Sequence, residues 1–207
     1  MYRPNAFVED DSAVLRDGLR QRVFATVICM IDGAIQIAYA PVVFDEGDGP
    51  HGSARFHLAG SNPVATMPDG TPLALSFLGP DTYVSPDWYE TPGRVPTWNY
   101  TAIEGRGVAR RLDEGGLRQL LVDLSSAEEN KLLPKRPWTI DEVPGEKMGA
   151  LMNAIVGFSM RFEMLEGKFK LSQNVTPEDA EGVMRGLVRR GDANSRDIAR
   201  AMRRTRT

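Results

Sequence analysis

An aromatic, proline-rich stretch in the middle of the chain, YVSPDWYETPGRVPTWNY at residues 83–100, constrains the fold more than any other feature. Each proline removes a backbone hydrogen-bond donor and fixes one backbone dihedral angle, so the stretch cannot be a helix interior or a central strand. Flexible loops are built from glycine, serine and charged residues, whereas this one contains Trp88 and Trp98. We therefore expect an ordered loop whose large side chains pack against something.

Two interpretations of this stretch fit the residues alone. It either covers the protein's own core as a packed connection, which is the simpler interpretation, or it forms the wall of a pocket for a flat aromatic ligand. Stiffened aromatic side chains beside the hydroxyl and amide groups of Ser85, Thr97 and Asn99 are what a largely pre-formed ligand site requires.

The remaining composition excludes several classes of protein. No apolar run reaches a membrane-spanning length, and the first residues contain no secretory segment, so we expect a cytoplasmic protein. Cys29 is the single cysteine and is expected to be a buried, inert thiol. With only two histidines a zinc-type site is not predicted. No residue stands out as a catalytic acid, base or nucleophile, and no catalytic residue is predicted.

The first three quarters of the chain indicate an α+β protein. Asp32-Gly33 is a turn pair between two apolar β-type runs, which predicts a hairpin. Gly105 and Gly107 inside a strand pattern predict a bulge or a close backbone approach. The periodicities predict strands at 23–31, 34–44, 53–59, 73–78, 98–112 and 158–164, and helices at 12–21, 117–130 and 146–156.

The end of the chain differs in charge from the rest. Thr176-Pro177 opens a helix that should end near Gly191, and a second helix follows from about Ala193. Residues 185–207 contain eight arginines and two aspartates, a balance of +6, so the rest must total −9 to give the net charge of −3. Clustered arginines neutralise phosphates of any sequence. Without a helix-turn-helix or zinc-finger pattern, however, a helix that is solvated or docked on the acidic body is the simpler interpretation.

Three polar clusters are candidate binding groups. The first follows the strand at 53–59, the second is the aromatic stretch, and the third is a basic, amide-rich segment after residue 166. Lysines together with hydroxyl and amide groups are a donor set that binds phosphate. The first and third clusters are His57, Ser61 and Asn62, and Lys168, Lys170, Ser172, Gln173 and Asn174.

Motifs spread over nearly the whole chain resemble the PaiB family of FMN-binding negative transcriptional regulators. They occur in the family's order and read MYRPNAF at 1–7, FAT at 24–26, HLA and NP at 57–63, GPDTYVSPDWY at 79–89, VPTWNY at 95–100, IVGF at 155–158 and KLSQN at 170–174. The combination of VPTWNY with KLSQN is the most specific part of this resemblance.

The resemblance implies a bacterial flavoprotein with the FMN-binding split β-barrel fold of pyridoxamine-phosphate-oxidase-like proteins, peripheral helices and a C-terminal helical segment. It also implies a homodimer whose FMN sites lie at the subunit interface, and a role as a repressor. The expected division is a split-barrel domain over residues 1–174 and a helical extension over 175–207. Because split barrels also include flavin reductases and oxidases, an FMN-dependent oxidoreductase acting on a small molecule is the alternative. DNA is a candidate partner for the basic tail, without a recognisable binding motif to support it.

Two departures from the family pattern affect the predicted phosphate region. Gly60 stands where relatives have a basic residue, and Tyr39 stands where they have a histidine. We therefore expect Lys168 or Lys170 to supply more of the counter-charge. With Trp98 and Asn99 approaching the isoalloxazine, the predicted cofactor-binding residues are His57, Ser61, Asn62, Tyr83, Ser85, Trp88, Thr97, Trp98, Asn99, Lys168, Lys170, Ser172 and Gln173.

Overall fold

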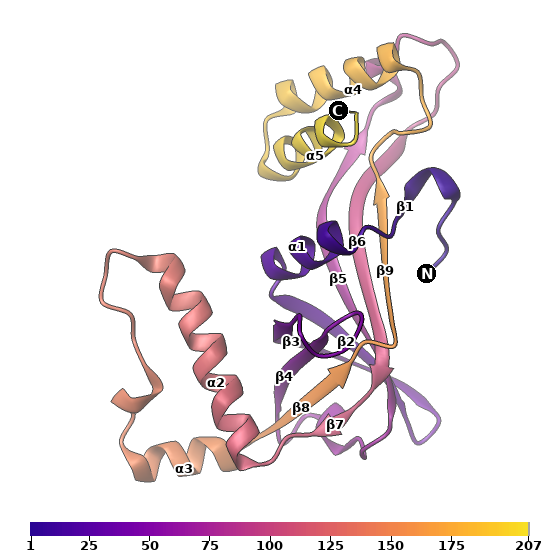
Figure 1. The fold of residues 1–207 in the computed structure, drawn as a ribbon. Helices are drawn as coiled ribbons and strands as arrows, with labels where there is room; N and C mark the ends of the chain where they lie inside the picture. Colours follow the sequence, from indigo (N-terminus) through magenta and orange to yellow (C-terminus); the bar gives the residue numbers. More distant parts are fainter. Residues whose placement is uncertain (207) are drawn as a thin grey trace. The chain divides into compact units, whose positions relative to one another are not determined.

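The structure is a computed structural model that describes residues 1–206 (Figure 1). Nine strands of the described chain join in one sheet, in the order β1-β9-β6-β5-β2-β3-β4-β8-β7. The strands are β1 (Val8–Glu9), β2 (Phe24–Ile31), β3 (Ala34–Asp45), β4 (Ser53–Ala59), β5 (Pro72–Val84), β6 (Thr97–Val108), β7 (Arg110–Arg111), β8 (Ile155–Arg161) and β9 (Met164–Lys170). The helices are α1 (Ser12–Gln21), α2 (Glu114–Glu129), α3 (Gly145–Asn153), α4 (Pro177–Arg190) and α5 (Ala193–Arg204). The predicted α+β class is confirmed.

The chain forms two compact units, which are described separately. The first contains Met1–Leu15, Leu78–Ile103 and the described chain from Glu166 onward. The second contains Arg16–Phe77 and Glu104–Leu165. The expected boundary between residues 174 and 175 falls inside the first unit, so the division into 1–174 and 175–207 stays a prediction.

The hairpin of β2 and β3 in the second unit confirms the predicted turn. Its register pairs Ile31 with Ala34 across Asp32 and Gly33, whose φ angles of 51° and 78° are those of a tight hairpin turn. One face of the hairpin is buried, as the period of two requires. The other face is also apolar, yet it is largely exposed, with Phe24, Met30, Ile35, Ile37 and Tyr39 between 56% and 68% accessible.

The glycines of β6 allow the close backbone approach that their spacing predicts. A Cβ on Gly107 would lie 2.2 Å from the carbonyl oxygen of Arg161, and one on Gly105 would lie 2.1 Å from the ring of Phe162. Real Cβ atoms are never this close to other atoms, so both positions in the second unit need glycine.

The predictions around β8 and β9 are wrong in their boundaries. The helix expected at 146–156 ends at Asn153, because β8 begins at Ile155 and pairs with β4 from Ala59 to Ser53. The helical pattern of 146–156 is overridden by this pairing, since short apolar runs fit either structure. The polar segment that begins at Glu166, for which no strand is predicted, lies in β9 as far as Lys170.

The last two helices of the first unit pack against each other (Figure 1). α4 begins as predicted, because the side chain of Thr176 accepts a hydrogen bond from the Asp179 backbone N–H and Pro177 occupies the first turn. It ends at Gly191, whose φ of 71° is the left-handed conformation of a helix C-cap. Their shared core consists of Val84, Leu171, Ala180, Val183, Met184, Leu187, Ile198, Ala199 and Met202.

Candidate functional site

The aromatic stretch is a loop only in its middle. β5 extends to Val84 and β6 starts at Thr97, so the two ends are strand and the connection runs over residues 85–96. Trp88 packs against α4 where Gly182 and Gly186 leave room for it. For this part of the stretch the packed connection is the correct interpretation.

A buried carboxylate holds the connection against α4. Asp179 is fully buried and accepts hydrogen bonds from the backbone N–H groups of Glu90 at 2.9 Å and Thr91 at 2.8 Å. The guanidinium of Arg94 donates a further bond at 3.0 Å. Burial alone raises the pKa of Asp179, but the Thr91 N–H and the Arg94 guanidinium outweigh it, so the net pKa lies below the usual value. The anionic side chain thereby fixes the path of the chain that enters β6.

Two aromatic side chains remain exposed beside this packed connection. Trp98 is 53% accessible and Tyr83 is 37% accessible, and their rings meet edge to face with centroids 6.1 Å apart. Asn99 and Thr101, which alternate with Trp98 along β6, are buried on the opposite face. β6 thus has one face in the core and one aromatic face open to a ligand.

Two lysines lie on the same face as these rings. The ammonium group of Lys168 lies 5.5 Å from the ring centroid of Tyr100 and 5.4 Å from that of Tyr2. Residues two apart in a strand share a face, so this contact assigns Trp98 and Lys170 to the same side as Tyr100 and Lys168. We call Tyr83, Trp98, Tyr100, Lys168 and Lys170 the aromatic–lysine face.

The ammonium groups of this face have no carboxylate partner among the residues that the structure describes. Within residues 1–206, neither Lys168 nor Lys170 forms an ion pair with a carboxylate. Lys170 donates a hydrogen bond to the Thr97 hydroxyl and lies 6.0 Å from the ring centroid of Phe7. Burial lowers the pKa of Lys170 from its ordinary value; the neighbouring Tyr100 opposes this lowering and the charge of Lys168 adds to it. A phosphate bound beside Lys170 would oppose the lowering of its pKa, because an anion favours the charged form of the ammonium group.

Several predicted binding side chains have structural partners instead. Asn99 is fully buried and donates to Ser172 Oγ at 2.9 Å. Gln173 closes the turn after β9 by bonding the backbone at Leu171 and Phe169. Ser85 caps the short 3-10 helix Pro86–Trp88. The structure therefore brings Tyr83, Thr97, Trp98, Lys168 and Lys170 together near the surface, and it uses Ser85, Trp88, Asn99, Ser172 and Gln173 to hold the surrounding backbone.

The remaining three predicted residues belong to the second unit. Asn62 accepts a bond from the Val64 N–H as a helix cap, and Ser61 is exposed. His57 pairs with Gly157, and its Nδ1 atom is buried without a hydrogen-bond partner in the described chain. Burial lowers the pKa of His57, so its ring is neutral near pH 7 and offers a donor rather than a charge.

Three side chains that contact predicted site residues are not foreseen from the sequence. Tyr2 and Phe7 lie against Lys168 and Lys170, and Arg206 donates to the Ser172 carbonyl at 2.6 Å. The only signal for the first two was the MYRPNAF motif itself. No local pattern predicts the contact of Arg206, because it joins positions 34 residues apart.

Two hollows of the described residues are lined by none of the five residues of the aromatic–lysine face. The larger, about 520 Å³, lies in the second unit between the first turn of α2, α3 and β8 and contains none of the predicted residues. A smaller one of about 340 Å³ adjoins Gln173 and Arg206. Among residues 1–206 no three His, Cys, Asp or Glu side chains are grouped for a metal ion. No helix in that range is long and apolar enough to cross a membrane.

The nine-stranded sheet of the described chain, with the helices around it, defines a protein of the split-barrel class. Residues 1–164 match the family described as "Putative FMN-binding domain", and the chain belongs to that family. FMN is the cofactor of this family, and the PaiB resemblance is confirmed.

The comparisons with individual proteins agree with this assignment. The chain is 28% identical over 204 residues to "Protease synthase and sporulation protein PAI 2" of Bacillus subtilis, covering 98% of this chain and 96% of that protein. It is 29% identical to an uncharacterized protein of Emericella nidulans over 242 residues, covering 98% of this chain and 96% of that protein.

Two solved structures, both 17% identical to this chain, share its fold. The FAD and heme binding protein of Mycobacterium smegmatis has a TM-score of 0.59, with 86% and 79% covered. The flavocytochrome Anf3 of Azotobacter vinelandii has a TM-score of 0.55, with 82% and 72% covered.

Proposed function

We propose that the chain binds FMN on the aromatic–lysine face and acts as a regulator of the PaiB type. In this proposal the isoalloxazine stacks on Trp98 beside Tyr83, and the phosphate is bound by Lys168, Lys170 and the Thr97 hydroxyl. The observation behind it is the pair of ammonium groups, without a carboxylate partner in the described chain, next to exposed aromatic rings. A buried or half-buried cation without a carboxylate partner costs folding free energy, and an anionic ligand that pairs with it reduces that cost.

The proposal extends to a homodimer with the flavin at the interface. The face that one protomer offers is open, whereas flavin-sized ligands are mostly enclosed when bound. The exposed apolar side of the β2–β3 hairpin is a surface that a second copy would cover, because monomers rarely expose contiguous apolar patches of this kind. The family pattern also implies His57, Ser61 and Asn62 of the second unit as phosphate residues, and this part stays a prediction from that pattern alone.

A regulatory role is preferred over turnover. None of the five side chains of the aromatic–lysine face is a carboxylate, histidine or thiol that could act as an acid or base near neutral pH. When FMN is bound it supplies redox chemistry, and the protein's own residues bind and orient it. The relative named for protease synthesis and sporulation supports a control function. A cytoplasmic location, in keeping with the single buried thiol of Cys29, is part of the proposal.

Titration with FMN tests this function. Lys170→Gln removes one charge-assisted contact, which contributes about 1.5–3 kcal/mol, and is expected to raise the Kd for FMN by about one to two powers of ten. Trp98→Leu is expected to weaken binding by about 5- to 100-fold, since stacking of a base on an aromatic ring contributes about 1–3 kcal/mol. The measurement is quenching of flavin fluorescence.

Two control variants keep the test specific. Trp138→Leu removes another partly exposed tryptophan, and Lys131→Gln removes another exposed lysine, both in the second unit. Both are expected to bind FMN as the wild type does. Wild-type protein that quenches no FMN fluorescence, or equal loss of affinity in the controls, would contradict the proposal.

A further inference from the structure

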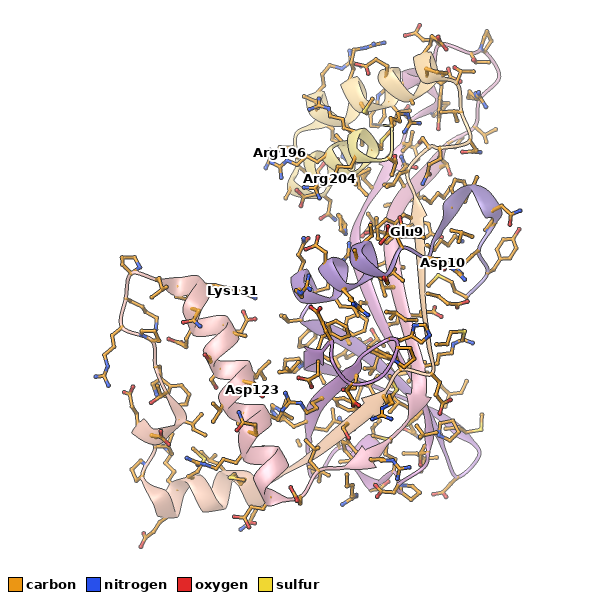
Figure 2. All side chains as sticks on the ribbon, viewed as in Figure 1. Glu9, Asp10, Asp123, Lys131, Arg196 and Arg204 are labelled. Atoms are coloured by element: carbon orange, nitrogen blue, oxygen red, sulfur yellow. The ribbon has the colours of Figure 1, made fainter. Side chains whose placement is uncertain are left out.

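The exposed surface of the last helix is a row of arginines. Arg196, Arg200, Arg203 and Arg204 occupy positions i, i+4, i+7 and i+8 of α5, and all four are exposed. Figure 2 shows Arg196 and Arg204 projecting outward from this helix. With a rise of about 1.5 Å per residue, the row extends over about 12 Å. The family model matches residues 1–164, so this surface lies beyond the matched residues.

The opposite side of α5 is fixed in the core, so the arginine row cannot turn inward. Ile198 and Met202 are fully buried. Ser195 is also fully buried and lies 3.0 Å, Oγ to Oγ1, from the hydroxyl of Thr82 in β5. The side chain of Asp192 caps the helix by accepting from the Ser195 N–H at 3.0 Å. The arginines therefore project from a rigid support, which lowers the entropy cost of binding.

The ion pairs of Arg190 and Arg200 are exposed. Arg200 pairs with Asp197 and Arg190 pairs with Asp192, each at 2.8 Å, and the side chains of both pairs are at least 43% accessible. Such exposed pairs contribute about 0–1 kcal/mol and exchange readily for another anion. Arg203 and Arg189 have no carboxylate partner within the described part of the chain.

The chemistry of the row favours phosphate. All eight cations after Lys170 are arginines, and the guanidinium fork matches phosphate oxygens in a bidentate way that lysine cannot. No large apolar side chain is exposed on α5, which distinguishes it from helices that insert into a membrane surface. The acidic remainder of the chain repels a polyanion and would direct it to this one basic surface.

We propose that the arginine row of α5, extended by Arg189 and Arg190 at the end of α4, binds the phosphate backbone of duplex DNA without reading its sequence. Successive phosphates of one strand advance about 3.4 Å along the duplex axis, so a row of about 12 Å reaches several of them. This inference does not depend on FMN, and its test is carried out in the absence of the flavin.

The test compares two triple variants with equal charge changes. Arg196→Gln/Arg200→Gln/Arg203→Gln alters the row, and Arg118→Gln/Lys131→Gln/Arg136→Gln alters three exposed cations of the second unit. Binding of a labelled random-sequence duplex of about 20 base pairs is followed by fluorescence anisotropy between about 50 and 200 mM NaCl.

Removing three phosphate contacts is expected to reduce the slope of log K against log salt by about 2.7 and the affinity at low salt by more than about tenfold. The control triple is expected to behave as the wild type. If the triple variant has a lower Tm than the wild type, the single variant Arg203→Gln replaces it in the measurement. This variant is expected to reduce the slope by about 0.9.

Four results would overturn the proposal: no wild-type binding at the lowest salt, unchanged binding by the α5 variants, equal loss in the control triple, or binding to phosphatidylserine vesicles but not to DNA. The α5 triple is expected to retain its FMN titration, so a failure of one proposal is distinguishable from a failure of the other.

Discussion

Gly186→Ala is expected to destabilise the protein by about 1–3 kcal/mol, although alanine is the better helix former. The added methyl would lie 2.2 Å from Cδ2 and 2.5 Å from Cγ of the Trp88 indole, atoms at the rigid centre of that ring. Glycine in a helix interior costs about 0.5–1 kcal/mol relative to alanine, so the collision outweighs the propensity gain. Gly182→Ala should behave similarly, because its Cβ would lie 2.1 Å from the Trp88 carbonyl oxygen.

A helical glycine elsewhere in the chain separates propensity from packing. Gly149 lies in α3 with no atom within 4 Å of a built Cβ, so Gly149→Ala is expected to be neutral or stabilising by up to about 1 kcal/mol. Urea unfolding with a common m-value measures all three variants. Gly186→Ala at least as stable as the wild type would refute the packing of Trp88 on α4.

Asp179→Asn is expected to release the connection over residues 85–96 from α4. The amide keeps a carbonyl oxygen for the Glu90 and Thr91 N–H groups, but it removes the negative charge that holds Arg94. The direct measurement is trypsin cleavage after Arg94, followed by mass spectrometry. The variant should be cut faster than the wild type, because the Arg94 side chain loses its buried partner.

The pH dependence of this effect has a definite sign. The pKa of Asp179 is lowered in the folded state, so its contribution to stability is complete above the pKa of an unfolded aspartate, about 3.9. The gap in stability between wild type and Asp179→Asn should be constant from about pH 5 to 8. This gap in stability should close as the pH falls below about 4 and passes through the lowered pKa of Asp179 in the folded state.

An exposed ion pair provides the control. Asp141 is 77% accessible and pairs with Arg118 at 2.7 Å, so Asp141→Asn should change stability by no more than about 0.5 kcal/mol at any pH in that range. A gap for Asp179→Asn that widens on acidification, or trypsin cleavage as slow as in the wild type, would contradict the role of the buried carboxylate.

Local sequence signals predicted those parts of the fold that depend on local chemistry. Asp32-Gly33 specified its hairpin, and Gly105 and Gly107 indicated a close approach. Thr176-Pro177 located the start of α4. In each case neighbouring residues decide the conformation, so no distant partner has to be known.

The site was only partly predictable, because burial depends on partners far along the chain. Trp98 and Asn99 are adjacent and looked equally suited to a ligand. The alternation of β6 exposes the tryptophan and buries the asparagine, which bonds Ser172 73 residues later. Trp88 likewise packs on α4 glycines that no local pattern relates to it. In the sequence Asp179 is an acidic residue in the first turn of a capped helix, which is common. Its three hydrogen-bond partners, Glu90, Thr91 and Arg94, lie 85 to 89 residues away and could not be inferred.

The most direct test of the proposed flavin site is a crystal structure of the protein soaked with FMN. The account predicts the isoalloxazine in van der Waals contact with the Trp98 ring and phosphate oxygens within hydrogen-bonding distance of the Lys170 ammonium. Flavin bound instead in the hollow beside α2 and α3, with Trp98 and Lys170 free of it, would contradict the account.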